Sequence, residues 1–195
     1  MDEGMTAHEG ISAHEGISAH EASSPRQGAA TALVITVSDR SSAGVREDVS
    51  GPTGADALRA LGFSVGPVVV VPDDFEVIAL LLRRAVEDGF PLVVTTGGTG
   101  LAPRDVTPEA TAAVVERQVP GIGELLRAAS RDRIPAASLS RGIAGVAGQT
   151  LIVNLPGSPG AVRDGIAALV PILWHAVDQV SGGDHAAAAG PDSAH

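Results

Sequence analysis

Cysteine and lysine are absent from this sequence and aromatic residues are scarce, and each of these gaps excludes a class of chemistry. Cysteine is absent, which excludes disulfides, thiolate chemistry and zinc sites with sulfur ligands. Lysine is absent as well, because all 13 basic residues are arginine, and this excludes a lysine nucleophile or Schiff base. With three Phe and one Trp, the chain has few aromatic platforms for stacking nucleic-acid bases.

Long apolar runs are also missing from the sequence. We find no stretch long enough to cross a bilayer, and the polar N-terminus lacks the basic and apolar regions of a signal peptide. By elimination, the sequence predicts a cytoplasmic protein with no membrane contact.

The charge is negative and unevenly distributed. The net charge is -10, with five acids and one Arg in residues 1–27, two acids in residues 184–195, and sixteen acids against twelve Arg between them. This balance leaves no basic surplus for general nucleic-acid binding. A length of 195 residues favours a single folded domain.

The first 30 residues have the composition of a tail. The hexapeptide AHEGIS occupies 7–12 and 13–18 and begins again at 19–21, and one Ile per repeat cannot bury a core. The histidines of the repeat lack the spacing of a His-Glu-x-x-His metal site. We predict a disordered tail over 1–30, a folded domain over 31–183 and a second disordered tail over 184–195.

The most informative stretch is 92–109. Residues 92–96 are an apolar, β-branched run typical of a buried parallel strand, and three glycines follow within 97–100. Thr107, Pro108 and Glu109 then have the chemistry of a helix start, with Thr107 as the N-cap. Glycines at the carboxyl end of a strand let backbone N–H groups approach an anion. Arg104 could pair with a phosphate and Asp105 could hold a hard cation, so the stretch predicts a phosphoryl-handling site.

The same stretch allows a structural interpretation, in which the glycines only make a tight strand-to-helix turn. It is not a Walker loop, because Gly-Lys-Ser/Thr does not follow. It is not a dinucleotide fingerprint either, because Pro103 stands where the last glycine belongs. From this loop alone, both interpretations remain open.

Two further polar loops follow predicted strands. Residues 32–37 form the first predicted strand, a hydroxyl-rich loop follows at 38–44, and a short helix is expected over 53–61. Residues 68–71 form the next strand, with Asp73 beyond its carboxyl end. Asp73 is either a helix N-cap, with Glu76 completing a capping box, or a site residue near the glycine loop.

The rest of the chain continues the alternation of helices and strands. A helix is expected after Asp74, with Ile78, Leu81, Leu82 and Ala85 on one face. Further helices are expected over 108–118, 120–129 and 160–180, and a strand pair over 142–154 turns at 148–149. In the last helix, Val170 is placed on the buried face and His175 on a partly exposed one. Ser158 is expected as its N-cap, with Pro159 in its first turn. The fold class predicted is α/β, a three-layer α/β/α sandwich with a mostly parallel sheet and a small antiparallel strand pair.

Taken together, the motifs resemble the Mog/MoaB family of molybdenum cofactor biosynthesis, which includes the G domains of gephyrin and its plant counterpart. The motifs occur in family order: TVSDR at 36–40, SGP at 50–52, PD at 72–73, TGGTG at 96–100, PRDVTPEAT at 103–111, LSR at 139–141 and NLPGSP at 154–159. The resemblance covers residues 31–183. It departs from the family pattern at Ser158, where many members have Asn, Gln or another polar residue.

The resemblance implies a molybdopterin-binding fold and, in active members, adenylyl transfer from Mg-ATP to the terminal phosphate of molybdopterin, releasing pyrophosphate. It implies that Asp73 and Asp105 are catalytic and act through Mg²⁺. The residues expected to bind substrate or nucleotide are Ser38, Asp39, Ser42, Thr96, Gly97, Gly98, Thr99, Gly100, Ser140, Asn154, Pro156, Gly157 and Ser158.

Other functions stay open at this point. A non-catalytic molybdopterin carrier and a nucleotide pyrophosphatase both fit the same loops. The family further implies a homotrimer or a hexamer of paired trimers, and a hand-over of product to a molybdate-inserting enzyme.

Overall fold

The computed structural model describes residues 30–182. The two predicted tails and the histidine repeat lie outside the described residues.

Seven strands within this range form one sheet in the order β2-β1-β4-β7-β6-β5, and β3 pairs with the same edge of β1 as β2 does. The strands are β1 (Thr31–Val37), β2 (Ser64–Val65), β3 (Val69–Val71), β4 (Leu92–Thr96), β5 (Arg117–Gln118), β6 (Ala144–Ala147) and β7 (Thr150–Leu155). The pairs β1–β3, β1–β4 and β4–β7 are parallel, whereas β5–β6 and β6–β7 are antiparallel. The predicted mostly parallel sheet with an antiparallel strand pair is confirmed.

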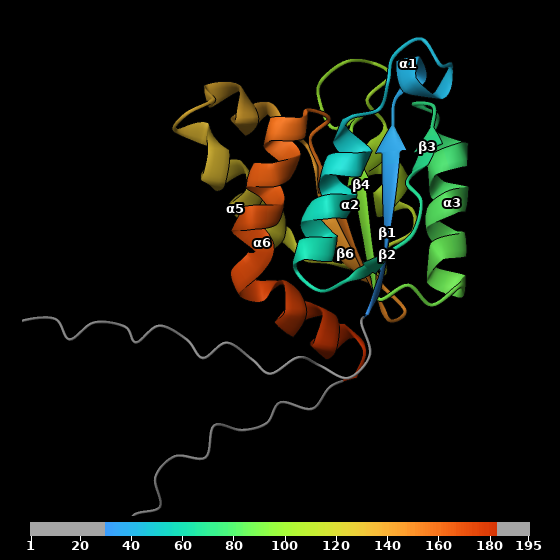
Figure 1. Cartoon of the computed structure of the whole chain (residues 1–195), viewed down its shortest axis with the longest axis vertical. Helices are drawn as coiled ribbons and strands as arrows, with labels where there is room; N and C mark the ends of the chain where they lie inside the picture. The colour runs from blue at the N-terminus through green and yellow to red at the C-terminus, as the bar shows by residue number, and fades with distance from the viewer. Residues whose placement is uncertain (1–29, 183–195) are drawn as a thin grey trace, which may run out of the picture.

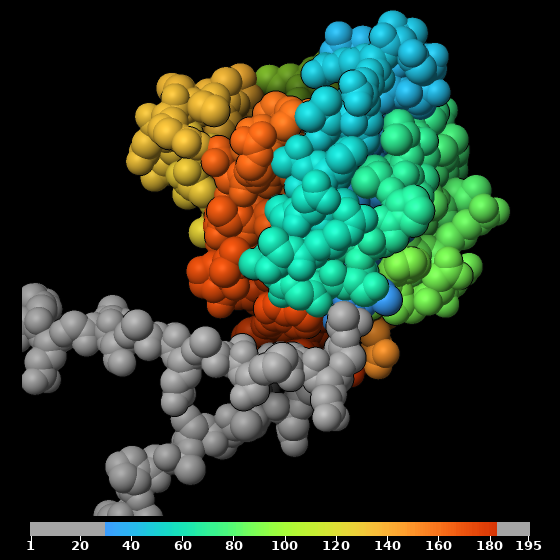
Figure 2. Space-filling view, viewed as in Figure 1, coloured from blue at the N-terminus to red at the C-terminus, as the bar shows by residue number. Residues whose placement is uncertain are grey.

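Helices cover both faces of the sheet (Figure 1). They are α1 (Asp39–Ser42), α2 (Ser50–Ala60), α3 (Phe75–Glu87), α4 (Thr107–Ala112), α5 (Pro120–Arg131), the 3₁₀ helix η1 (Pro135–Leu139) and α6 (Pro159–Val180). Buried residues of α2, α5 and α6 pack on one face of the sheet, and those of α3 and α4 pack on the other. The surfaces of α2 and α6 lie side by side on the face shown in Figure 2.

The two cores follow from the alternation of side chains along each strand. In β4, Leu92 and Val94 join the α2/α5/α6 core, and Val93 joins the α3/α4 core. All five residues of β4 are buried, as expected for a strand covered on both faces. Ile78, Leu82 and the other buried positions of α3 recur at the predicted helical spacing.

Several predicted boundaries and caps are wrong. α2 begins at Ser50 instead of residue 53, and the helix expected over 108–118 ends at Ala112, after which β5 forms. Thr107 is the first residue of α4 instead of its N-cap, and the N-cap of α3 is Asp74 instead of Asp73. The Asp74 side chain accepts a hydrogen bond from the backbone N–H of Val77 at 3.1 Å. Asp73 is therefore free of the capping role.

α6 departs from expectation in two ways. Val170 is 46% exposed instead of buried. By length and mean hydropathy alone, α6 passes for a membrane span (22 residues, mean hydropathy 1.2), contrary to the expectation from the sequence. Its buried face, which includes Val162, Ile166 and Leu169, packs into the core with α2 and α5, as in the core helix of a globular domain. Ser158 caps its N-terminus as predicted, accepting from Ala161 N at 3.3 Å.

The register of the parallel strands brings four loops together. β3, β1, β4 and β7 are neighbours in that order, so their carboxyl ends lie at one edge of the sheet. The loops that follow these strands carry Asp73, Asp39, the glycines of 97–100, and residues 156–158. In an open α/β sheet this edge is where ligands bind.

Candidate functional site

A crevice with two compartments opens at this edge of the sheet. One compartment, of about 430 Å³, lies between the glycine loop, α5, η1 and the start of α6. The other, of about 380 Å³, lies between the loops that follow β1, β3 and β4. Gly97, Gly98, Asp105 and Gly157 line both compartments, so the two share a junction at the glycine loop.

The two compartments differ in chemistry. The α5 compartment has apolar side chains in its wall, including Leu126, Ile134 and Leu139. The second, which we call the charged compartment, is lined by five acidic residues, two arginines and the hydroxyls of its loops. The charged residues are Asp39, Glu47, Asp48, Asp73, Asp105, Arg40 and Arg46. A flat ring suits the first kind of wall and a charged group suits the second.

The glycine loop packs too tightly for side chains at its centre. Gly97 has a φ of +99°, and a Cβ there would collide with the carbonyl oxygen of Val37. Gly98 has a φ of +61°, and a Cβ there would collide with the hydroxyl of Thr107 and come within 3.0 Å of Asp73 Oδ1. Only glycine meets both demands at these positions.

The carboxylates of Asp73 and Asp105 flank this loop. Asp73 Oδ1 lies against Gly98, and Asp105 Oδ2 lies 2.8 Å from where a Cβ on Gly100 would stand. Asp105 Oδ2 accepts from the backbone N–H of Ala102 at 2.8 Å. The convergence of two acidic residues from separate strand ends, expected from the sequence, is present in the structure.

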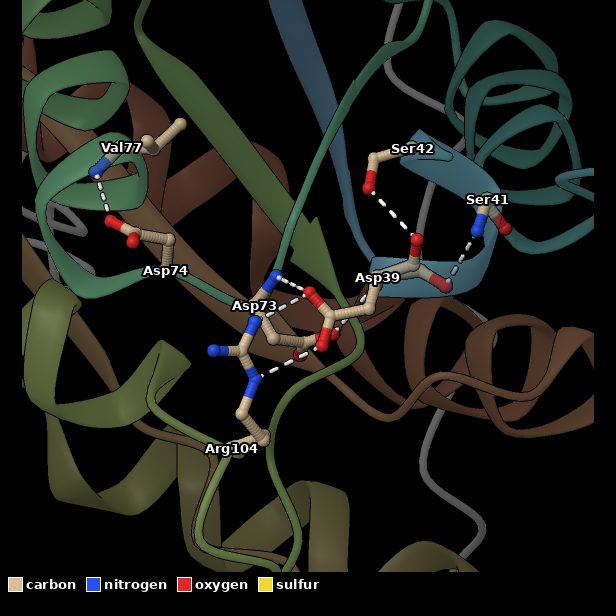
Figure 3. A network of polar contacts seen from close by, with 8 residues as sticks. Asp39, Ser41, Ser42, Asp73, Asp74, Val77 and Arg104 are labelled. Carbon is tan, nitrogen blue, oxygen red and sulfur yellow. Dashed lines mark hydrogen bonds and ion pairs between the residues drawn. The ribbon is translucent and has the colours of Figure 1, made fainter. Parts of the chain in front are cut away.

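Asp39 and Arg104 join Asp73 in a hydrogen-bonded network (Figure 3). The backbone N–H of Asp39 donates to Asp73 Oδ2 at 2.8 Å, and that of Asp73 donates to Asp39 Oδ1 at 3.0 Å. Arg104 donates to the Asp39 carboxylate through Nε at 3.0 Å and Nη2 at 2.7 Å. Arg104, which the sequence suggested as a phosphate partner, is thus paired with Asp39 in this structure.

The network moves the pKa values of its two aspartates in opposite directions. The hydrogen bond from Arg104, and then that from the Asp73 N–H, lower the pKa of Asp39. Burial raises the pKa of Asp73. The hydrogen bond from the Asp39 N–H and the charge of Arg104 lower this pKa, whereas the negative charges of Asp39 and Asp105 raise it further. Carboxylates with separated pKa values are common at functional sites.

Arg141, which the sequence analysis did not count as a site residue, fixes the glycine loop from the other side. Its backbone N–H donates to Thr99 O at 2.8 Å, its Nε donates to Gly100 O at 2.6 Å, and its Nη2 donates to Asp105 O. Its Nη1 pairs with Glu109, and this hydrogen bond lowers the pKa of Glu109. The LSR motif was the available signal, because it places an arginine beside the predicted Ser140.

The loop after β7 is tied to the site by hydroxyl groups. Ser50 Oγ donates to Gly157 O at 2.7 Å, and Thr96 Oγ1 donates to Pro156 O at 2.8 Å. Ser50 stands at the start of α2, and Ser158 caps α6, so the positive ends of two helices border the crevice.

Asn154 is a fully buried polar residue among the predicted contacts. Its side chain is 1% exposed. Its Nδ2 donates to the hydroxyls of Thr95 and Thr111 at 3.0 and 2.9 Å, and its Oδ1 accepts from Ile143 N at 3.2 Å. Asn154 borders the α5 compartment, and its amide links β7 to β4, α4 and the strand pair.

The structure brings most of the predicted residues into the crevice. Those lining the α5 compartment are Gly97, Gly98, Thr99, Gly100, Asp105, Ser140, Asn154, Pro156, Gly157 and Ser158. Those lining the charged compartment are Ser38, Asp39, Asp73, Thr96, Gly97, Gly98, Asp105 and Gly157. Ser42 lines neither, and its hydroxyl donates to the backbone oxygen of Asp39 at 3.0 Å.

Arginines are what the sequence analysis missed. Arg127 lines the α5 compartment and donates to the backbone oxygens of Ser140 and Gly142 at 3.3 and 3.2 Å. Arg40 and Arg46 line the charged compartment. A helical or loop arginine has no distinctive pattern around it, so its position could not be found without the fold.

The carboxylates of the crevice are compatible with Mg²⁺ if substrate phosphates and water supply its remaining ligands. Among the described residues, no group of three or more His, Asp or Glu side chains is placed to hold a metal ion. Mg²⁺ sites in nucleotide enzymes commonly use one or two carboxylates together with substrate phosphates and water. Asp73 Oδ1 and Asp105 Oδ1 accept no hydrogen bond from the described residues, so the two carboxylates fit such a shared site.

An open α/β sheet with a glycine loop and two helix N-termini at its carboxyl edge has the features with which such folds bind anionic ligands. The family described as "Probable molybdopterin binding domain" matches residues 33–175, and the chain belongs to it.

Characterised proteins are similar over the same range. A molybdopterin adenylyltransferase of Helicobacter pylori is 41% identical over 154 residues, which are 76% of this chain and 86% of that protein. The Mog protein of Mycobacterium ulcerans, a solved structure, matches with a TM-score of 0.73 and 46% identity over 78% of this chain and 99% of the other. Gephyrin of Dictyostelium discoideum is 39% identical over 158 residues, but these are only 22% of gephyrin.

Proposed function

We propose that this chain is a molybdopterin adenylyltransferase of molybdenum cofactor biosynthesis. An oxygen of the terminal phosphate of molybdopterin attacks the α-phosphorus of ATP, the bond from that phosphorus to the bridging oxygen of the β-phosphate breaks, and pyrophosphate leaves. The observation that carries the proposal is the placement of Asp73 and Asp105 on either side of a glycine loop where two compartments meet. The curated H. pylori relative supports the same activity.

The chemistry suits a site without a nucleophilic side chain. The attacking phosphate oxygen is already anionic, so the protein has to align the two substrates and offset charge. Backbone N–H groups of the glycine loop and the N-termini of α2 and α6 would receive the phosphates. Asp73 and Asp105 would hold Mg²⁺, which neutralises phosphate charge when bound.

Two compartments match two substrates. The apolar wall formed by Leu126, Ile134 and Leu139 would accept a flat ring of one substrate, and the charged compartment would accept the polar part of the other. The shared junction at Gly97, Gly98 and Asp105 is then the place where phosphates of both substrates come together. Direct alignment at this junction would supply most of the rate enhancement.

The deciding experiment is a single-turnover assay of the full chain with molybdopterin, ATP and Mg²⁺. Adenylylated molybdopterin and pyrophosphate are expected in equal amounts. Asp105→Asn should lower kcat by about 100-fold or more, since several kcal/mol of charge stabilisation depend on the metal site. The melting temperature should stay within about 2 °C of the wild type, because Asp105 is partly exposed and makes only a local hydrogen bond.

Asp56→Asn is a matched control. Asp56 lies on α2 in an exposed pair with Arg59, at 2.8 Å, outside both compartments. This variant should keep full activity. Tight molybdopterin binding without product would instead indicate a carrier, and release of AMP from ADP-ribose without a pterin would indicate a pyrophosphatase.

Three further features belong to the proposal, of which the assembly and the hand-over come from the family resemblance and the location from the lack of targeting signals in the sequence. We expect a homotrimer, or a hexamer of paired trimers, in the cytoplasm, and a hand-over of adenylylated molybdopterin to a molybdate-inserting enzyme. Light scattering of the purified chain would measure the first of these directly.

A further inference from the structure

Asp39 and Asp73 are neighbours because β1 and β3 are. The two strands are parallel and pair Val37 with Val71, so each aspartate stands two residues beyond a paired valine. The backbone N–H of Ser38 also donates to Val71 O at 2.9 Å, which extends the pairing past the end of the strands. The reciprocal hydrogen bonds between the aspartates continue this pairing through side chains (Figure 3).

The two carboxylates use their oxygens differently. Asp39 Oδ1 accepts from Asp73 N and from Arg104 Nη2, and Asp39 Oδ2 accepts from Arg104 Nε. Asp73 Oδ2 accepts from Asp39 N, whereas Asp73 Oδ1 accepts from none of the described residues and lies beside Gly98. Both oxygens of Asp39 are therefore used within the protein, and one oxygen of Asp73 is left for a ligand.

We propose that Asp39 is a positioning residue, whose carboxylate holds Asp73 and Arg104 and so directs the free oxygen of Asp73 to the junction, without contacting substrate. This differs from the family resemblance, which counts Asp39 among the substrate contacts. It rests on the proposed function in one respect, that Asp73 is a carboxylate on which metal and phosphate depend.

The network connects three loops that are remote in sequence. Asp39 follows β1, Asp73 follows β3, and Arg104 belongs to the loop that follows β4, 65 positions from Asp39. The Arg104–Asp39 contact is bidentate, the geometry in which a partly exposed ion pair stabilises most reliably. Because Arg104 is adjacent to Asp105, the pair also restrains the segment that carries the second carboxylate.

The hydrogen bonds of the network agree with this division of roles. Asp39 is anchored by the guanidinium of Arg104 and by the backbone N–H of Asp73, whereas Asp73 keeps one carboxylate oxygen beside the glycine loop. A residue that orients a metal-binding carboxylate through hydrogen bonds commonly accompanies such a ligand.

Three variants separate positioning from contact. Asp39→Ala removes the acceptor of both Asp73 N and Arg104, and should lower kcat/KM for Mg-ATP by about 10- to 100-fold, the usual effect of losing a supporting residue. Asp39→Asn keeps an acceptor for Asp73 N and should recover part of the loss. Arg104→Gln should resemble Asp39→Asn, and the two together should be no worse than either alone, because they break one contact. Molybdopterin affinity should change by less than about threefold in all of them.

A binding measurement tests the proposal without turnover. Mn²⁺ affinity in the presence of a non-hydrolysable ATP analogue, measured by electron paramagnetic resonance, should follow the same order: wild type, then Asp39→Asn and Arg104→Gln, then Asp39→Ala. Asp56→Asn, which removes the charge of another Arg–Asp pair at 2.8 Å, should bind Mn²⁺ like the wild type. This readout holds even if the chain turns out to be a carrier without adenylyl transfer.

Two results would overturn the proposal. If Asp39→Asn lowered Mn²⁺ affinity as much as Asp39→Ala did, and Arg104→Gln did not lower it, Asp39 would be a direct ligand. Unchanged Mn²⁺ affinity in Asp39→Ala together with a lower melting temperature would leave Asp39 with a structural role only. If the wild type and the variants showed the expected order of Mn²⁺ affinity but the wild type formed no product, the proposed function would be contradicted and the role of Asp39 would stand.

Discussion

Burial of Asp73 disfavours the charged form of its carboxyl group in the folded state. Burial raises its pKa in the folded protein, so the folded state binds a proton more tightly than the unfolded chain does. The stability that Asp73 contributes is therefore present at low pH and lost as pH rises through its folded pKa. We expect Asp73→Asn to unfold at higher denaturant concentration than the wild type at pH 7 without metal, although it should lose activity.

The same comparison at acidic pH serves as the control, because a protonated Asp73 and the asparagine of the variant are both uncharged. The difference in denaturant midpoint between Asp73→Asn and the wild type should be smaller at acidic pH. A variant that is less stable than the wild type at pH 7 would mean that the hydrogen bond from Asp39 N, which lowers the pKa of Asp73, outweighs burial.

Asn154 should matter for stability more than for binding. Asn154→Ala leaves the hydroxyls of Thr95 and Thr111 and the N–H of Ile143 without their partner in a buried region. We expect a loss of about 2–4 kcal/mol in the free energy of unfolding, measured by chemical denaturation. Ser158→Ala, at an exposed cap, should cost about 1 kcal/mol by comparison. Equal losses in the two variants would contradict the role assigned to the buried amide.

At the level of single residues, the sequence predicted which groups meet better than it predicted what they do. Asp73 and Asp105 were found because each follows a strand with a clear apolar pattern. The sequence offered Asp73 as the N-cap because Glu76 completes a capping box with it, whereas the adjacent Asp74 caps the helix in the structure. The pairing of Arg104 with Asp39 was missed because nothing in a sequence marks partners 65 positions apart.

Among the loops, the glycine loop has the strictest steric requirement. Gly98 and Gly44 both have positive φ, +61° and +70°, but a Cβ on Gly44 meets nothing within 4 Å. Gly44→Ala should therefore show the backbone cost alone, about 1–2 kcal/mol. Gly98→Ala adds a collision with Thr107 and a close approach to Asp73 Oδ1, so it should cost more and also weaken Mn²⁺ binding.

The matched pair isolates packing from backbone strain, with unfolding curves and Mn²⁺ titrations as the measurements. Similar losses of stability, or normal Mn²⁺ affinity in Gly98→Ala, would show that the loop has room for a side chain beside Asp73. The glycines would then serve only the turn, as the structural interpretation of the sequence held.

Helices and strands were predictable to the extent that periodicity defines them. β1, β4, β7 and the turn at 148–149 were placed closely, because buried strands are continuous apolar runs and their ends carry turn residues. The start of α2 was misplaced because Gly51 and Pro52 suggested a loop. In the fold, Asp48 Oδ1 accepts from Ser50 N and Gly51 N at 3.1 Å and starts the helix earlier. β2 and β5, with two residues each, exist only through pairing with β1 and β6.

For the whole molecule, alternating strands and helices were enough to predict three layers and a ligand-binding edge. The two Gly/Pro loops also indicated a bipartite crevice, but not which segments divide it into two compartments. That division arises because α5 and η1 close one side of it, while the loops after β1 and β3 close the other. These segments are ordinary in sequence and gain their role from their position beside the sheet.

The binding of Mg-ATP should be measurable as stability of the whole domain. The crevice is built from four strand ends and two helix N-termini, so the unfolded chain has no equivalent site. Mg-ATP at about 100 times its Kd should add about 2.7 kcal/mol to the free energy of unfolding. For a domain of this size that is a rise of about 5–10 °C in Tm, measured by differential scanning fluorimetry.

The metal-dependent part of this rise tests the two carboxylates together. ATP with EDTA should give a smaller shift than Mg-ATP in the wild type, and Asp105→Asn should show the same small shift with and without Mg²⁺. Asp56→Asn, outside the crevice, should respond like the wild type. If Asp105→Asn kept the full Mg²⁺-dependent shift, the metal would be held without Asp105, which would then need another role.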